Sequence, residues 1–327
     1  MRGLSVYASR ASRSLAVRLK PGTNVRFFHF FCFHSSPRRR LPTPVSMCGM
    51  SQPSTTEHVY GRSPEEYARL TLQARILRPY TERFFRAAGL APGMHVLDIG
   101  SGIGDVAMLA AEIVGPNGRV VGIDMDPSFL EHARRRAEES GCAPWVTFEE
   151  AKADAFTTSD RFDALVSRYI LLYLPDPAAT LRRLLECVKP GGIVVCHEVD
   201  LTDPHPSYPP CPLWDKGYKL VSEAFLCAGA PVTFGRKFGS AFLRAGLPFP
   251  TIVSEGTVGG GPGSHMYPWL AATVKSLAPR LAELRLSLPR ELEPLDTLAA
   301  RLEQEAIRQG SQVMASIQFG AWARKPL

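Results

Sequence analysis

Three glycines within five residues are the first feature of this chain that could serve chemistry. The run Asp98-Ile99-Gly100-Ser101-Gly102-Ile103-Gly104 follows a short apolar segment and leads at once into Asp105-Val106-Ala107. Glycine at this spacing permits positive φ in a tight turn and lets the backbone approach a ligand with no Cβ in the way. We therefore expect a ligand over the carboxyl end of a first strand, where a doubly wound sheet reverses its strand order.

The residue three places after Gly102 separates two classes of ligand. A nicotinamide or flavin dinucleotide loop needs a third glycine there, and this chain has Asp105. An acid at a helix N-terminus repels the pyrophosphate that would have to rest on it. S-adenosylmethionine carries no phosphate and bears a sulfonium cation. The pattern GxGxG, preceded by an acid at Asp98, favours S-adenosylmethionine.

A second acid ends the next strand. The segment Arg119 to Asp124 is apolar between its ends, and Asp124 comes 20 residues after Gly104. A carboxylate at a strand end accepts hydrogen bonds from the two hydroxyls of a ribose, which suits any adenosine cofactor. Helix capping is the alternative role, but Asp126 before Pro127 already provides a cap. We interpret Asp124 as a ribose ligand.

The elements that must position these residues alternate between strand and helix, with short connections. This alternation predicts a parallel sheet with crossover helices. The expected strands are 95–99, 120–124, 146–149, 164–167 and 193–197, and the expected helices are 64–88, 105–114, 127–140 and 177–188. Beyond residue 200 we expect helical runs at 213–227, 267–286 and 291–309, strands at 251–254 and 314–324, and a glycine-rich connection at 256–263.

The segments Val96 to Ala107 and Val121 to Asp126 together resemble the class I S-adenosylmethionine-dependent methyltransferases, especially the small-molecule branch of bacteria and fungi. The resemblance covers roughly residues 60 to 200 and includes the Lys189-Pro190-Gly191-Gly192 turn. It implies an α/β fold with a doubly wound, seven-stranded Rossmann-like sheet whose last strand is antiparallel. A helical cap inserted after the fifth strand completes the expected fold.

The resemblance also implies a set of cofactor contacts. Asp98 and the Gly100 to Gly104 loop would hold the methionine end, while Asp154 and Ala155 would hold the adenine. The segment Tyr60 to Ser63 and the following helix through Arg69 and Arg75 resemble the leader that covers the cofactor, although a solvated helix face is the alternative for these arginines. The expected cofactor-binding residues are Tyr60, Asp98, Gly100, Ser101, Gly102, Gly104, Asp124, Met125, Asp154, Ala155 and Ser167.

Methyl transfer needs alignment and exclusion of water more than it needs a covalent catalyst. A general base is optional, and the weak candidates are His197 and Glu198 at a strand end, with His205 and His265 further along. Each also suits a structural role. Five aromatic residues could shape the acceptor pocket or could simply pack in the core: Tyr169, Tyr173, Trp214, Phe225 and Trp269.

Missing motifs narrow the acceptor. Ser167-Arg168-Tyr169-Ile170 stands where DNA amino-methylating enzymes carry a Pro-Pro-aromatic motif, and the paired-glutamate loop of protein arginine methyltransferases is missing. The seven cysteines form no CxxC pair, so we expect reduced thiols and no metal site. A small organic acceptor is the expected substrate. The alternatives are a non-catalytic cofactor-binding or partner protein of the same fold and, less favoured, a nucleotide-dependent oxidoreductase.

The positive charge of this chain is concentrated at its start. Residues 1 to 46 hold nine of the 38 basic residues and no acid, which leaves 29 basic against 31 acidic residues in the remainder. A body without basic excess disfavours nucleic-acid binding, and no apolar run is long enough to span a membrane. We expect residues 1–49 to be a basic leader, disordered or targeting, and residues 50–327 to form the methyltransferase domain, with a core to about 200 and a cap and final strands beyond. The expected location is cytoplasmic, or mitochondrial if the leader is a transit peptide.

Overall fold

The computed structural model describes residues 64–202 and 206–327. The chain divides into two units, Met1–Cys48 and Gly49–Leu327, and every described residue belongs to the second. The helices of the described residues are α1 (Pro64–Ala88), α2 (Asp105–Val114), α3 (Pro127–Glu139), α4 (Pro177–Leu184), α5 (Pro212–Cys227), α6 (Phe238–Ala245), α7 (Met266–Leu277) and α8 (Leu298–Gln309). The strands are β1 (His95–Ile99), β2 (Arg119–Asp124), β3 (Val146–Glu150), β4 (Phe162–Arg168), β5 (Val188–Asp200), β6 (Ser207–Tyr208), β7 (Thr251–Gly260) and β8 (Gln312–Arg324).

The strands form one sheet in the order β3-β2-β1-β4-β5-β8, and both β6 and β7 pair with β8. The first five strands of this order are parallel, and β8 runs antiparallel to β5. This confirms the expected doubly wound sheet with an antiparallel last strand, to which the two-residue β6 adds an eighth member. The reversal of strand order between β1 and β4 creates the crevice that such a sheet offers to a ligand.

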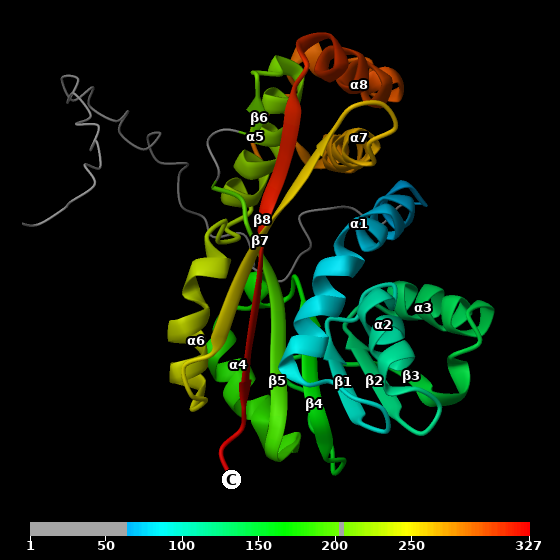
Figure 1. Ribbon diagram of the computed structural model, residues 1–327, viewed down its shortest axis with the longest axis vertical. Coiled ribbons are helices and arrows are strands. Elements are labelled where there is room, and N and C mark those ends of the chain that lie inside the picture. Colours follow the sequence, from blue (N-terminus) through cyan, green and yellow to red (C-terminus); the bar gives the residue numbers. More distant parts are fainter. Residues whose placement is uncertain (1–63, 203–205) are drawn as a thin grey trace, which may run out of the picture. The chain divides into compact units, whose positions relative to one another are not determined.

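Alternating side chains of the strands divide the core into two layers. Val96, Ala164 and Val166 point to the face that is covered by α1, α2 and α3. Leu97, Ile99 and Leu165 point to the other face, which α4 and α6 cover (Figure 1). The period of two in a strand therefore gives each parallel strand two buried faces.

Helix α3 begins and ends as its sequence predicts. The carboxylate of Asp126 accepts a hydrogen bond from the backbone N–H of Ser128, and Pro127 occupies the first helical position. Gly141 follows the helix with φ +74°. Helix α4 repeats the device, because Asp176 accepts from the N–H groups of Ala178 and Ala179. Short polar caps thus fix where each crossover helix leaves the sheet.

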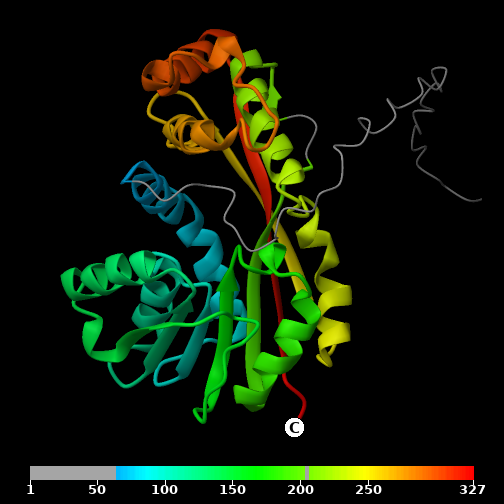
Figure 2. The same ribbon diagram turned by 180° about the vertical axis from the view of Figure 1, so that it is seen from behind.

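Strands β7 and β8 extend beyond the parallel sheet and carry the cap. Strand β5 pairs with the carboxyl-terminal part of β8, as far as Asp200 opposite Ile317, while β7 pairs with almost the whole of β8, from Thr251 opposite Trp322 to Gly260 opposite Gln312. The part of β8 from Gln312 to Ser316, beyond its pairing with β5, is its upper part. Helices α5, α7 and α8 gather around this upper part (Figures 1 and 2). The expected helical cap after the fifth strand is present.

Several boundaries in the second half differ from expectation. Strand β7 continues to Gly260, so the expected glycine-rich connection at 256–263 is half strand. The expected helix 267–286 ends at Leu277, just before Pro279, and α8 begins only at Leu298, beyond Pro294. Proline lacks the N–H that a continuing helix needs, which explains both breaks. Helix α6 was not predicted.

No helix among the described residues is both long enough and apolar enough to cross a membrane. The five cysteines in this part of the chain are all free thiols, and four of them are buried. No three His, Cys, Asp or Glu side chains between residues 64 and 327 gather as a metal site, the gap at 203–205 aside.

Candidate functional site

The glycine loop between β1 and α2 has the backbone that its sequence predicts. Gly100, Gly102 and Gly104 adopt φ of +67°, +52° and +86°. A Cβ on Gly100 would lie 2.7 Å from the side chain of Ile170, whereas a Cβ on Gly102 would meet nothing within 4 Å. Gly100 is therefore required by packing. Gly102 keeps an open space beside the backbone, as a ligand cradle requires.

Asp124 fastens this loop to the end of β2. One carboxylate oxygen accepts a hydrogen bond from the N–H of Gly102 at 2.8 Å, and the other accepts from the N–H of Asp126 at 2.9 Å. The side chain lines the cavity that opens above the loop. Asp124 thus stands where a ribose ligand is expected, and it already shapes the loop without a ligand.

Asp98 takes a position that its sequence did not predict. Its side chain is fully buried and is not among the residues that line the cavity. Burial raises the pKa of Asp98 well above its ordinary value, although the charge of Arg168 opposes this. Desolvation favours the neutral carboxyl group. Asp98 lies beneath the loop and does not face the ligand space directly.

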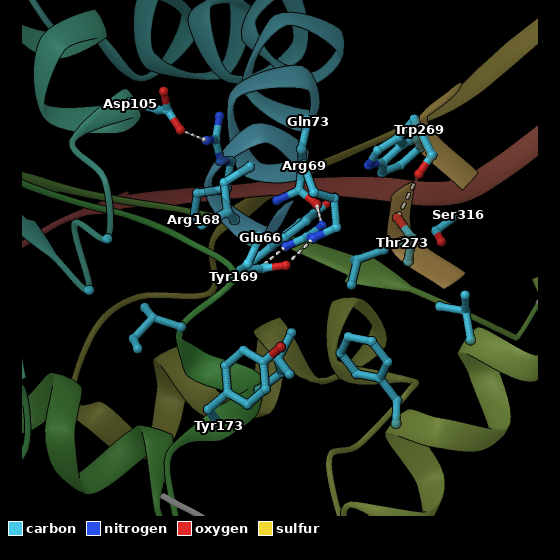
Figure 3. Close-up of a pocket in the computed structure, with 18 of the residues that line it drawn as sticks. Glu66, Arg69, Gln73, Asp105, Arg168, Tyr169, Tyr173, Trp269, Thr273 and Ser316 are labelled. Atoms are coloured by element: carbon cyan, nitrogen blue, oxygen red, sulfur yellow. Dashed lines mark hydrogen bonds and ion pairs between the residues drawn. The ribbon is translucent and has the colours of Figure 1, made fainter. Parts of the chain in front are cut away.

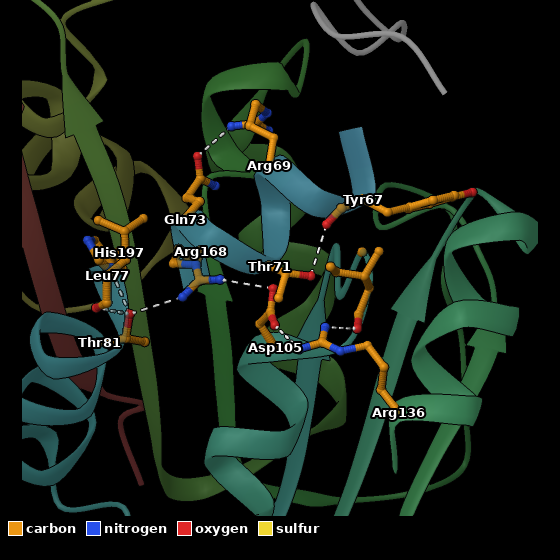
Figure 4. Close-up of polar contacts among 12 residues, drawn as sticks. Tyr67, Arg69, Thr71, Gln73, Leu77, Thr81, Asp105, Arg136, Arg168 and His197 are labelled. Carbon is orange, nitrogen blue, oxygen red and sulfur yellow. Dashed lines mark hydrogen bonds and ion pairs between the residues drawn. The ribbon is translucent and has the colours of Figure 1, made fainter. Parts of the chain in front are cut away.

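Asp105, at the start of α2, is paired with two arginines. Its carboxylate lies 2.7 Å from the guanidinium of Arg136 and 3.7 Å from that of Arg168. Figure 4 shows Arg136 and Arg168 reaching this carboxylate from opposite sides. The two arginines therefore largely compensate the negative charge of Asp105, so its repulsion of a pyrophosphate is weaker than the sequence alone predicts.

The main cavity runs from the glycine loop to the cap. It holds about 1290 Å³ of empty space, including its opening to solvent. One end is lined by Gly100 to Ile103 and Asp124, and the other by apolar and aromatic side chains of β5, α5 and α7. The expected aromatic residues all line it: Tyr169, Tyr173, Trp214, Phe225 and Trp269. Figure 3 labels Tyr169, Tyr173 and Trp269 among them. The cavity thus joins a polar loop to an apolar chamber.

Helix α1 closes one wall of this cavity with a buried ion pair. The Nε and one terminal nitrogen of Arg69 each donate to the Glu66 carboxylate at 2.7 Å, and the other terminal nitrogen donates to Gln73 at 2.8 Å. Ser276 of α7 donates to the same carboxylate at 2.5 Å. This network ties the leader helix to the cap. Arg75 is exposed and does not line the cavity.

A second, smaller cavity lies beside the expected adenine segment. Met125 and Asp154 line it together with Gly100 and Asp124, but Ala155 does not. The backbone carbonyls of Asp154 and Ala155 each accept a hydrogen bond from Arg183 of α4. Arg183 therefore holds the segment in place, and Met125 and Asp154 reach a space continuous with the loop.

The remaining predicted residues separate into three groups. Ser101 and Gly102 line the main cavity, whereas Gly104 is the N-cap of α2 and does not line it. Ser167 is fully buried and does not line the cavity. Tyr60 and His205 lie outside the described residues.

His197 is enclosed between two side chains. Its Nδ1 lies 3.0 Å from the Thr81 hydroxyl and its Nε2 lies 2.9 Å from the side-chain oxygen of Gln318. An amide oxygen only accepts hydrogen bonds, so Nε2 carries the proton, and Nδ1 is left without one beside the Thr81 hydroxyl, which donates to the Leu77 carbonyl at 3.1 Å. Burial lowers the pKa of His197 to about 3. His197 is a neutral packing residue that does not line the cavity.

Glu198 organises the segment after β4. Tyr169 adopts φ +58°, and this left-handed turn directs the N–H groups of Ile170 and Leu171 onto one carboxylate oxygen of Glu198 at 3.0 and 2.8 Å. Burial raises the pKa of Glu198 to about 8. Like His197, Glu198 does not line the cavity, and the exposed His265 does not either. The geometry therefore gives Glu198 a positioning role.

Several cavity residues escaped the sequence analysis, among them the polar side chains of Glu66, Gln73 and Arg168. Arg168 carried a usable signal, because it is the last residue of β4, whose carboxyl end lies at the same edge of the sheet as the glycine loop. Glu66 and Gln73 carried only the spacing of one helix face with Arg69.

Comparisons with known proteins bear on the family of this chain. Residues 90–224 match the family model described as a methyltransferase domain. The chain is 35% identical over 148 residues to the ubiquinone/menaquinone biosynthesis C-methyltransferase UbiE of Ectopseudomonas mendocina, which covers 45% of this chain and 55% of that protein. It is 30% identical over 177 residues to an uncharacterised 37.1 kDa protein of a Streptomyces fradiae transposon, covering 54% and 50%. The chain spans about half the length of these curated relatives.

Among solved structures, a candidate methyltransferase of Bacillus halodurans C-125 aligns with a TM-score of 0.51 at 18% identity. The alignment covers 76% of this chain and 99% of that one, and it bears on the fold. The glycine loop, the strand order and the matched family model define a protein built around an adenosine-type cofactor. Residues 90–224 thus form a methyltransferase domain, and the curated relatives support the expected class I S-adenosylmethionine-dependent methyltransferase.

Proposed function

We propose that this protein transfers the methyl group of S-adenosylmethionine to a small, largely apolar organic acceptor by in-line displacement. The observation that carries the proposal is the single cavity that runs from the glycine loop into an aromatic chamber under the cap. Such a cavity gives two molecules one shared space, which a two-substrate transfer requires.

The residues present suit the cofactor. Gly102 leaves the space beside its backbone free, Asp124 presents a carboxylate at the end of β2, and Met125 and Asp154 border the adjoining space. When bound, S-adenosylmethionine supplies a methyl carbon that its sulfonium has activated. The chain's own task is to hold the two reactants in line, and orientation of this kind lowers barriers by roughly 7 to 11 kcal/mol.

The chamber supports an acceptor without charge. Its walls include Trp214, Val221, Phe225 and Leu270, and its cationic Arg69 is already paired with Glu66. A charged acceptor would lose its hydration in the chamber without gaining a partner, and contact with apolar walls does not offset this loss. His197 and Glu198, the candidate bases near the end of β5, do not line the cavity, so we propose that neither acts as a general base.

Two other functions remain distinguishable. A non-catalytic cofactor-binding protein would bind S-adenosylhomocysteine without turnover, and a nucleotide-dependent oxidoreductase would bind NADH. The positions of Gly100, Gly102 and Gly104 favour retained binding of a ligand, and the open chamber favours turnover. The pairing of Asp105 with Arg136 and Arg168 does not create a site for the pyrophosphate of a dinucleotide.

The proposal is tested by incubating the full chain with methyl-labelled S-adenosylmethionine and a set of acceptors that share one ring system. 1-Naphthol and 1-naphthoate have nearly the same shape but differ in charge at neutral pH. We expect S-adenosylhomocysteine to form faster with neutral phenols and hydroquinones than with the matched carboxylates. Tight cofactor binding with no turnover across neutral acceptors would instead favour the non-catalytic alternative.

A further inference from the structure

Arg168 is a cavity residue at the exact edge where the glycine loop begins. Ser167 of β4 lies opposite Ile99 of β1. The residues that follow them along the chain, Arg168 and Gly100, therefore lie at the same edge of the sheet. The Arg168 side chain is only 8% exposed, yet it lines the cavity beside the loop. A buried cation therefore stands at the polar end of the ligand space.

The guanidinium of Arg168 is loosely engaged by its neighbours. Among the described residues, its polar contacts are the Thr81 hydroxyl at 3.5 Å and the Asp105 carboxylate at 3.7 Å. Arg69, by contrast, makes three hydrogen bonds of 2.7 to 2.8 Å with Glu66 and Gln73. Charge-assisted bonds of arginine normally measure about 2.7 to 2.9 Å. Arg168 thus retains donors that protein groups do not fully use.

Asp105 does not depend on Arg168 for its charge balance. Its carboxylate lies 2.7 Å from Arg136, a full ångström closer than Arg168. Asp98, the other acid nearby, is fully buried under the loop and does not line the cavity. Neither acid completes the guanidinium fork, which is shaped to receive a carboxylate from the cavity side.

We propose that Arg168 binds the carboxylate of the cofactor's methionine end. This inference rests on the proposed function, because it assigns one end of the same cofactor. The expected role of Asp98 at the methionine end stays a prediction, and the proposal adds a cation at the carboxyl end of β4. A planar fork accepts a carboxylate through two parallel hydrogen bonds, and a half-closed cavity strengthens them relative to water.

The experiment compares two ligands that differ in the proposed contact. S-adenosylhomocysteine has the amino-acid end, whereas 5′-methylthioadenosine has the same adenosine and thioether without it. Both are titrated calorimetrically into the full chain and its Arg168→Gln variant. We expect the substitution to weaken S-adenosylhomocysteine about 10- to 150-fold, as the loss of a charge-assisted pair implies, and to leave methylthioadenosine within about twofold.

Two further variants control for folding and charge. Arg75→Gln removes an exposed arginine of α1 that does not line the cavity, and both ligands should bind it as they bind the unmodified chain. Arg168→Lys keeps the charge without the fork, so we expect an intermediate loss confined to S-adenosylhomocysteine. Thermal unfolding of each variant reports whether the fold persists.

The outcomes separate the two proposals. If Arg168→Gln and Arg168→Lys weaken the binding of both ligands equally, or weaken the binding of neither, the carboxylate contact is refuted while cofactor binding stands. Unchanged binding of both ligands is also the result expected if Arg168 binds the carboxylate of an acceptor. If the unmodified chain binds neither ligand, the proposed function fails and the inference fails with it. Should Arg168→Gln not fold, the selectivity of Arg168→Lys between the two ligands decides.

Discussion

Replacing Gly102 by alanine separates a glycine kept for a ligand from one kept for the fold. At φ +52° an alanine pays the left-handed backbone cost of roughly 1 to 2 kcal/mol, but its Cβ meets nothing within 4 Å. Gly141, after α3, offers a matched control, because it has φ +74° and also nothing within 4 Å, and it does not line the cavity. The two substitutions should therefore lower stability by similar amounts.

Their effects on binding should differ. The Cβ of Gly102→Ala would project beside the loop that lines the cavity, so we expect S-adenosylhomocysteine to bind at least about tenfold more weakly, a loss of about 1.4 kcal/mol. Gly141→Ala should bind it like the unmodified chain. Calorimetric titration and thermal unfolding of both variants measure the two effects. Equal affinities for the two variants would refute the interpretation of Gly102 as part of a ligand cradle.

Three further substitutions probe the neighbouring polar groups. Asp124→Ala removes the acceptor of the Gly102 and Asp126 hydrogen bonds and the proposed ribose contact. Because a charge-assisted bond contributes roughly 1.5 to 3 kcal/mol, S-adenosylhomocysteine should bind about ten- to a hundredfold more weakly in calorimetry. Unchanged affinity in a folded variant would exclude the ribose role. Burial lowers the pKa of His197 from 6.5 to about 3, so its neutral state contributes stability that is complete above pH 6.5 and is lost as the pH falls toward 3. Denaturant unfolding of His197→Gln should therefore depend less on pH below 6.5, by up to about 1.4 kcal/mol per pH unit; parallel curves would contradict this. The pKa of Glu198 is raised from 4.5 to about 8 by burial, so its contribution is complete below pH 4.5 and is lost as the pH rises through 8. The Glu198→Gln variant should gain stability relative to the unmodified chain across that window, and a difference independent of pH would count against the assignment.

The first half of the fold could be predicted because its signals are local. Strand β1, helix α2 and the caps of α3 each depend on residues within a few positions of one another, as the Asp126 cap and Pro127 illustrate. The second half depends on contacts between distant segments. Strand β5 extends to Asp200 because β8 pairs with it from the far end of the chain, and no local pattern near residue 200 announces this.

The site shows the same division. The positive φ of Gly100, Gly102 and Gly104 followed from their spacing. The burial of Asp98 and the exposure of Arg168 to the cavity did not, because both depend on which side of β1 and β4 the chain packs its helices. The pairing of Asp105 with Arg136 joins residues 31 positions apart, and it weakens an electrostatic argument that considered Asp105 alone. Long-range charge pairing is thus what the sequence analysis lacked.

Calorimetric titration of the full chain with S-adenosylhomocysteine, beside NADH as a control, tests the central claim most directly. If the cavity above the glycine loop holds an adenosine cofactor without phosphate, S-adenosylhomocysteine should bind with a Kd of order micromolar, about −8 kcal/mol, and NADH should give no heat of binding. Binding of NADH, or of neither molecule, would contradict the account of the loop and of the cofactor that it serves.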